Sequence, residues 1–254
     1  MMRLKKIALL KDRVESWDKY PFNVPAIRSF EEIDVTSRLV YFVGENGSGK
    51  STLLEAIASQ YGFGYEGGNR NYSSVTTDSV RAVDPLVKAL RVGFTTRTGK
   101  GFYLRAESFF NIATSVDQIG FFDPYGGKSL HEQSHGESFL SLLKHRFTRK
   151  GFYLIDEPEA ALSPSRQMSL LVLLHDLLKN NDDIQFIIAT HSPIVLALPG
   201  AQILSFDGGI IREVGYEETL PFQIYRRFFG ERERFMETLF SELKFRNGEE
   251  GIED

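Results

Sequence analysis

The segment from Gly44 to Thr52, which reads GENGSGKST, restricts the fold of this 254-residue chain more than any other stretch. It fits the pattern G-x-x-x-x-G-K-[ST], whose glycines let successive backbone N–H groups converge on a phosphate. Residues 38–43 before it are apolar, β-branched or aromatic as in a buried strand, and residues 52–57 after it have helical spacing. This strand, turn and helix are the context that a phosphate-binding loop requires. The sequence therefore predicts nucleotide binding, the alternative being a glycine-rich turn that binds nothing.

The side chains of this loop indicate how a nucleotide is held. Lys50 is expected to bridge the β- and γ-phosphates of ATP, and Ser51 to bind Mg²⁺. The predicted nucleotide-binding residues of the loop are Glu45, Asn46, Gly47, Ser48, Gly49, Lys50, Ser51 and Thr52. Upstream of the loop, Trp17, Tyr20 or Phe22 could stack on adenine, although packing of these rings over a sheet edge is the more ordinary explanation.

Two carboxylates follow a second apolar run. Residues 152–158 read FYLIDEP, so a predicted buried strand ends in Asp156 and Glu157. In an open parallel sheet, ligands bind beyond the carboxyl ends of the strands. Asp156 is expected to bind Mg²⁺ or its water, and Glu157 to orient or deprotonate the attacking water. The alternative is a solvated acidic turn.

A histidine ends the next predicted strand. His191 lies in the segment ATHSP, residues 189–193. At the end of a strand beside the phosphate-binding loop, an imidazole can hydrogen-bond a γ-phosphate and sense its loss. A capping or core histidine is the alternative. Lys50, Glu157 and His191 are therefore the candidate catalytic residues.

The apolar pattern along the chain predicts an α/β fold. Strands are expected at 3–10, 38–43, 86–95, 101–106, 152–155, 184–190, 202–206 and 210–214. Helices are expected at 137–148, 165–179 and from Pro193, and residues 221–244 are expected to pack as one terminal amphipathic helix. In the second half of the chain, strands that alternate with helices predict right-handed crossovers and a parallel sheet.

Composition excludes several classes of function. A net charge of −4 gives no overall attraction to nucleic acid or to an acidic membrane, and the lack of cysteine excludes disulfides and thiolate chemistry. The longest apolar stretch, residues 170–174, is far shorter than the roughly 20 residues of a membrane span. We therefore expect a soluble, cytoplasmic protein.

With these motifs in view, the chain resembles the ATP-binding cassette ATPases, and most closely the soluble SMC/RecF/OLD-like branch of AAA-type ATPases. The glycine loop, Asp156-Glu157-Pro158 and His191 carry the resemblance, which covers roughly residues 3–210. It implies a P-loop NTPase fold: a central, mostly parallel sheet flanked by helices, with an antiparallel β region and a small helical lid. It further implies one domain over 1–254, with a small helical subdomain at 108–150 inserted in it.

The resemblance also implies a signature loop that caps the γ-phosphate from the opposite subunit. Residues 133–138, QSHGES, stand in that place, and Ser134 and Gly136 match the serine and the second glycine of the signature. His135 stands where the first glycine is usual, and the alternative for Ser134 is a plain helix N-cap. Glu107 is the nearest candidate for the family's Mg²⁺-coordinating glutamine.

Three functions fit these residues. The first is a stand-alone ATPase in which ATP holds two copies together head to tail and hydrolysis releases them. The second is the ATP-binding subunit of an ABC transporter, and the third is a nucleotide-dependent DNA-binding repair or defence module. The third would use basic side chains from Arg70, Arg97, Lys100, Lys144, Arg146, Arg149 and Lys150. An unidentified protein partner is compatible with each function.

Overall fold

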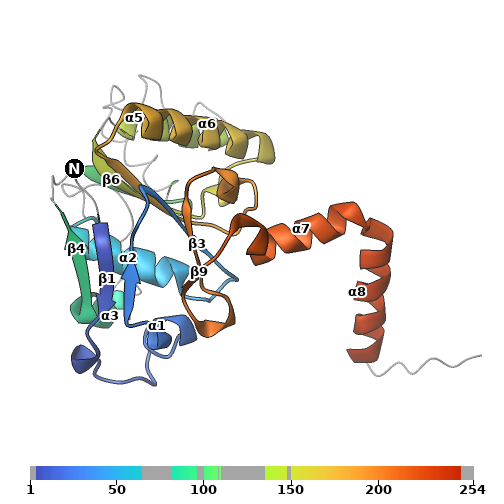
Figure 1. Cartoon of the computed structure of the whole chain (residues 1–254), viewed down its shortest axis with the longest axis horizontal. Coiled ribbons are helices and arrows are strands. Elements are labelled where there is room, and N and C mark those ends of the chain that lie inside the picture. Colours follow the sequence, from blue (N-terminus) through green and yellow to red (C-terminus); the bar gives the residue numbers. More distant parts are fainter. Residues whose placement is uncertain are drawn as a thin grey trace, which may run out of the picture.

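The computed structural model describes residues 4–64, 82–95, 100–107, 109, 135–147 and 150–246. Its larger sheet has six strands in the order β5-β6-β7-β3-β8-β9 (Figure 1). The strands are β5 (Gly101–Arg105), β6 (Gly151–Asp156), β7 (Ile184–Ala189), β3 (Leu39–Val43), β8 (Gln202–Ser205) and β9 (Arg212–Glu213). The five neighbouring strands β5, β6, β7, β3 and β8 are parallel, and β9 is antiparallel to β8. This arrangement confirms the predicted, mostly parallel sheet.

Helices cover both faces of this sheet. α2 (Lys50–Tyr61) packs on the face that carries Val40, Phe42 and Leu154. α5 (His135–Arg146) and α6 (Pro164–Asn180) pack on the opposite face (Figure 1). Strands buried on both faces need a nearly continuous apolar run, and every residue of β3, β6 and β7 is buried. These are the three strands that the sequence marks most clearly.

A smaller antiparallel sheet lies beyond α2. It contains β2 (Glu32–Asp34), β1 (Leu4–Leu9) and β4 (Leu90–Phe94), in that order. Two short helices, α1 (Pro25–Ser29) and α3 (Asp84–Ala89), adjoin it (Figure 1). This sheet is the predicted antiparallel region.

Two boundaries differ from the prediction. The expected strand over 86–95 starts only at Leu90, because the short helix α3 begins at Asp84, with Pro85 in its first turn, and buries Leu86 and Ala89. The helix expected from Pro193 is a single 3₁₀ turn, η6 (Val195–Ala197). Leu198 after it is extended, as expected for a residue that precedes a proline.

The C-terminal prediction is wrong in two respects. Residues 221–244 form two helices, α7 (Leu220–Gly230) and α8 (Arg232–Arg246), separated at Glu231. Figure 1 shows that α7 leads away from the body and that α8 turns at its outer end, so the pair forms an arm instead of packing on the sheet. Within the described ranges, no helix is both long and apolar enough to cross a bilayer.

Candidate functional site

The loop between β3 and α2 has the backbone conformation that its glycines predict. Gly44, Gly47 and Gly49 all have positive φ, and the φ of Gly49 is 103°. A Cβ atom on Gly49 would also lie 3.0 Å from Cγ1 of Val24, so a side chain here would be both strained and crowded. The turn therefore delivers the N-terminus of α2, which begins at Lys50, directly to the loop.

The ammonium of Lys50 lies inside this loop. Its Nζ donates hydrogen bonds to the carbonyl oxygens of Gly44, at 2.8 Å, and Glu45, at 3.0 Å, and the residue is buried. The loop's own carbonyls thus satisfy the ammonium and hold it at the N-terminus of α2. A positive charge and free helix N–H groups at one place favour an anion.

Asp207 anchors the loop from the neighbouring strand. Its Oδ1 accepts a hydrogen bond from the backbone N–H of Glu45 at 3.0 Å, and its Oδ2 accepts one from Ser205 Oγ at 3.1 Å. Our sequence analysis did not assign Asp207 to the site. The only signal was its position directly after the predicted strand at 202–206, which ends at the same edge of the sheet.

Ser51 and Asp156 meet across the site. Ser51 Oγ donates a hydrogen bond to Asp156 Oδ1 at 2.9 Å, and Asp156 is buried at the end of β6. A hydroxyl and a carboxylate are hard oxygen ligands that suit Mg²⁺. The described residues contain no cluster of three or more His, Asp or Glu side chains that could hold a metal. Two protein oxygens still fit Mg²⁺, which usually keeps several waters and binds substrate phosphates.

The guanidinium of Arg105 lies beside three carboxylates, one of which is Asp156. Arg105 lies 3.3 Å from Glu55, 3.6 Å from Glu107 and 3.7 Å from Asp156. Burial raises the pKa of Asp156 to about 6 and the pKa of Glu55 to about 7, although the charge of Arg105 lowers both. Three carboxylates thus share one guanidinium, an arrangement whose charge a bound cation would balance. Sequence analysis missed Arg105 and Glu55, which reach the site only through strand order and helix packing.

A pocket of about 240 Å³ brings most of the predicted residues together. Its lining is Asn46, Gly47, Gly49, Lys50, Ser51, Thr52, Glu107 and Glu157. Glu107 faces Arg105 and is largely exposed, so it lies at the rim beside the pair of Ser51 and Asp156.

Glu157 has an unusual backbone. Its φ and ψ are 50° and 55°, and it is the one non-glycine residue with positive φ in the described part of the chain. Such a conformation costs of order 1–3 kcal/mol and persists where surrounding contacts impose it. Here the backbone N–H of Glu157 donates to the carbonyl of Ala189 in β7, at 2.9 Å. The strained residue is therefore fixed at the sheet edge, with its carboxylate in the pocket.

His191 lies beside Glu157 and is held by Glu159. The Nδ1 atom of His191 is 4.0 Å from Glu157 Oε1 and 3.3 Å from Glu159 Oε1. Glu159 Oε1 also accepts hydrogen bonds of 2.7 Å from the backbone N–H of His191 and from Thr190 Oγ1. Glu159 thus fixes the loop that carries His191. Our sequence analysis did not assign Glu159 to the site.

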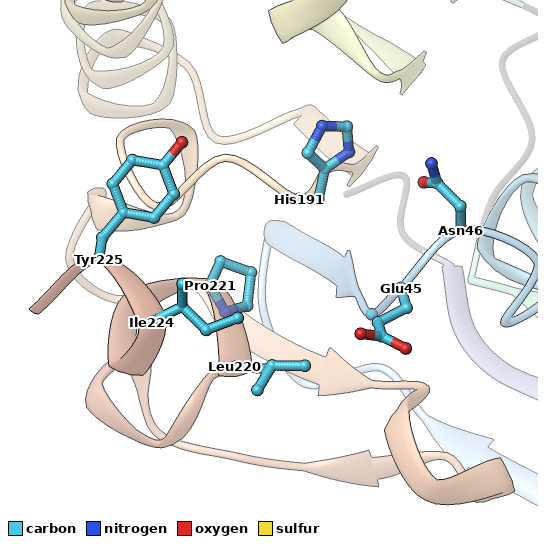
Figure 2. A pocket seen from close by; sticks show the side chains of 8 residues that line it. Glu45, Asn46, His191, Leu220, Pro221, Ile224 and Tyr225 are labelled. Carbon is cyan, nitrogen blue, oxygen red and sulfur yellow. The ribbon is translucent and has the colours of Figure 1, made fainter. Parts of the chain in front are cut away.

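A second pocket, of about 450 Å³, lies between the loop and α7. Figure 2 shows His191, Glu45 and Asn46 on one side and side chains of α7 on the other. The α7 side chains that line it are Leu220, Pro221, Ile224 and Tyr225. Asn46 lines both pockets, so the two cavities adjoin at the phosphate-binding loop.

The predicted signature loop is described only in part. Ser134 lies outside the described residues, while Gly136 is buried in the first turn of α5 and lines neither pocket. A Cβ atom at Gly136 would lie 2.5 Å from Nη1 of Arg166, which pairs with Glu137 at 3.1 Å. A side chain at this position would therefore displace Arg166 from its place between α5 and α6, whether or not nucleotide is bound.

The three upstream aromatic residues lie in different surroundings. Phe22 is buried in the core, and Trp17 packs against it, with 6.0 Å between ring centroids. Tyr20 is exposed, and its hydroxyl lies 3.0 Å from Thr52 Oγ1. Tyr20 is thus the aromatic residue of the three that reaches the phosphate-binding loop.

Two family models match parts of the chain. Residues 23–150 match the AAA domain family, and residues 130–196 match the AAA ATPase domain family. No protein of curated function matches the chain.

Similar solved structures include the SMC head domain from Thermotoga maritima, with 19% identity over 84% of this chain and 98% of that one, at a TM-score of 0.45. Another is an ATP-binding cassette of an ABC transporter, with 19% identity over 86% and 94% of the two chains and a TM-score of 0.49. The AAA domain match over 23–150 covers 128 of 254 residues, just over half of the chain. The chain therefore belongs to the AAA domain family and is a nucleotide-binding ATPase of the P-loop type.

Proposed function

We propose that this protein hydrolyses ATP to ADP and phosphate with Mg²⁺, and that its nucleotide state controls the association of two copies. The hydrogen bond from Ser51 to Asp156 is the observation that carries the proposal. It joins the phosphate-binding loop to the acidic strand end, and Glu157 lines the same pocket. The groups that would bind the cation, the phosphates and the attacking water therefore lie together at one site.

The proposed binding step uses groups that are already oriented. Lys50 would exchange its contacts with the carbonyls of Gly44 and Glu45 for phosphate oxygens. Ser51 and Asp156 would hold Mg²⁺, which when bound neutralises charge on the phosphates. Asp207 keeps the backbone of Glu45 in place, so the loop needs little rearrangement.

The proposed hydrolytic step uses Glu157 and His191. Glu157 would orient the attacking water and accept its proton, because its backbone is fixed while its carboxylate remains accessible to the pocket. His191, held by Glu159, would hydrogen-bond the γ-phosphate. The strain at Glu157 supports this assignment, because unusual backbone conformations cluster at functional sites.

The proposed dimer completes the site. Glu45, Asn46 and Gly47 are exposed, so a nucleotide bound to one copy would stay open to water on that side. A second copy packed head to tail would close it with the loop that carries Ser134, and a closed site strengthens its electrostatic contacts. Only the γ-phosphate would touch both halves, so ATP would favour the dimer and ADP its release.

Replacing Glu157 with Gln tests the hydrolytic role. Steady-state hydrolysis should fall by about 10²-fold or more, because the proton acceptor is lost, while ATP binding persists. Glu217→Gln, on an exposed turn far from the loop in sequence, is the control and should leave turnover unchanged. Normal turnover in the Glu157→Gln variant would remove Glu157 from the mechanism.

Mixing two inactive variants tests the closure by a second copy. Lys50→Ala removes the phosphate contact, and Ser134→Arg blocks the proposed cap. If the cap acts between copies, a heterodimer of the two variants retains one intact composite site, so activity should reappear on mixing. No recovery despite mixed dimers would contradict the head-to-tail arrangement.

The two other functions gain no support from specific contacts. Among the candidate basic residues, Lys150 pairs with Asp183 at 3.5 Å, and the Arg146 guanidinium lies 5.9 Å from the Phe102 ring centroid. Arg70, Arg97 and Arg149 lie outside the described residues. Copurified permease or nucleic acid would redirect the assignment to a transporter subunit or a DNA-binding module.

A further inference from the structure

The C-terminal arm, α7 and α8, has no buried residue between Leu220 and Ser241. α7 has 11 residues and α8 has 15. Isolated helices shorter than about 12–15 residues are marginal in water, and helices in proteins gain most of their stability by packing an amphipathic face. The arm therefore needs a surface that covers it.

Some aromatic residues of the arm already pack against each other at its elbow. The rings of Phe228 and Phe235 lie 5.8 Å apart, and the Arg227 guanidinium lies 5.7 Å from the Phe235 centroid. Five large apolar side chains of the arm remain exposed, although the rings of Tyr225 and Phe229 contact each other at 5.6 Å. They are Ile224 (44% exposed), Tyr225 (48%), Phe229 (73%), Leu239 (41%) and Phe240 (54%).

This exposed apolar surface has the size of one side of a stable dimer. At about 200 Å² for a large side chain, the five residues expose about 500 Å² in each copy. A standard protein interface covers about 800 Å² per partner, and about 60% of that area is apolar, which is also about 500 Å². One arm thus exposes about as much apolar area as one partner contributes to a standard interface.

The charges of the arm favour a second copy of the chain as the partner. The stretch from Leu220 to Ser241 carries Arg226, Arg227, Arg232, Arg234, Glu231, Glu233 and Glu237. Four positive and three negative charges create no basic field that would attract DNA or an anionic membrane. In a two-fold interface the same patch meets itself, so a patch with both signs can pair opposite charges, whereas a single-sign patch repels its copy.

We propose that two copies associate through α7 and α8 without nucleotide, in an interface separate from the ATP-dependent one. α7 begins at the pocket shared with Gly44, Glu45, Asn46 and His191 (Figure 2), so the arm interface lies next to the ATP site of each copy. Joining two chains in this way makes the closure of their nucleotide sites intramolecular. The effective concentration for closure is then set by the arm and not by the protein concentration.

Light scattering on the full chain, with EDTA and without nucleotide, tests the arm interface. The wild-type protein should have twice the mass of the 28.9-kDa chain at micromolar concentration. The double variant Phe229→Glu/Phe240→Glu should dissociate at least about 100-fold more readily, since buried interface aromatics dominate binding energy. The control Val172→Glu changes a 63% exposed residue of α6 and should leave the dimer intact. A monomeric wild type, or a double variant that dimerises like the wild type, would overturn the proposal.

A labelling experiment gives an independent readout. Because the chain has no cysteine, Thr238→Cys provides one label on α8 in each copy. Donor- and acceptor-labelled chains should transfer energy without nucleotide, and the Phe229→Glu/Phe240→Glu background should abolish the transfer. Absence of transfer would refute the arm dimer. ATP-dependent association of the double variant carrying Glu157→Gln tests the proposed ATP dimer separately, because it does not need the arm.

Discussion

Replacing the buried Glu55 with Gln should change the free energy of unfolding relative to wild type in a pH-dependent way. The difference, variant minus wild type, should be more favourable to the variant at high pH than at low pH. Glu55 is 8% exposed, and burial raises its pKa from 4.5 to about 7 although Arg105 lies 3.3 Å away. The folded protein therefore holds this proton more tightly than the unfolded chain does. The stabilisation that the folded state gains by binding this proton more tightly is fully present below pH 4.5 and is lost as the pH rises through 7. Glutamine does not titrate, so the variant escapes this loss.

The magnitude follows from the two pKa values. A pKa that rises from 4.5 to about 7 changes the wild-type unfolding free energy by about 2.5 kcal/mol between pH 5 and pH 8.5. Urea denaturation of both proteins at these two pH values measures the difference. The matched control is Glu107→Gln, which removes a carboxylate that faces the same Arg105 but is 76% exposed, so its loss should change stability little. A Glu55→Gln effect that is equal at both pH values would refute the reasoning.

Two further substitutions test the residues that support the loop and the histidine. Asp207→Ala removes the acceptor for the Glu45 N–H, so the loop is less ordered before binding. Calorimetry should show an ATP dissociation constant raised about 10-fold, and an unchanged affinity would remove Asp207 from this role. Glu159→Ala leaves the Thr190 hydroxyl and the His191 N–H without their acceptor, which should cost about 2 kcal/mol in thermal or urea unfolding. Glu159→Gln keeps an acceptor oxygen and should recover most of that stability; equal losses in the two variants would contradict the assignment.

The parts of the site that sequence reasoning found are those set by local chain geometry. The glycines, Lys50 and Ser51 follow one another in a single turn, and Asp156 and Glu157 end a strand whose apolar run is unmistakable. Strands buried on both faces leave a strong signal, so β3, β6 and β7 were also predictable.

The supporting residues left no such signal. Arg105 and Asp207 act on residues 51 and 162 positions away in the chain, and their roles depend on the order of strands in the sheet. Burial of Glu55 depends on the packing of α2, which its sequence neighbourhood does not reveal. The arm was misread for a similar reason, because its amphipathic pattern predicts that a face is covered but not which surface covers it.

The register of the parallel sheet sets the relative positions of the site residues. Arg105 pairs with Asp156, Asp156 with Ala189, Ala189 with Phe42, and Phe42 with Leu204, so one continuous row crosses five strands.

Just beyond this row lie the phosphate-binding loop, Glu157, His191 and Asp207, each contributed by a different strand end. Because side chains alternate along a strand, a shift of one residue in β6 would place Asp156 on the opposite face and separate it from Ser51. The buried apolar residues of β6 oppose that shift, because it would exchange the side chains that pack on the α2 side with those that pack on the α5 and α6 side. The sheet core therefore sets the geometry of the nucleotide site.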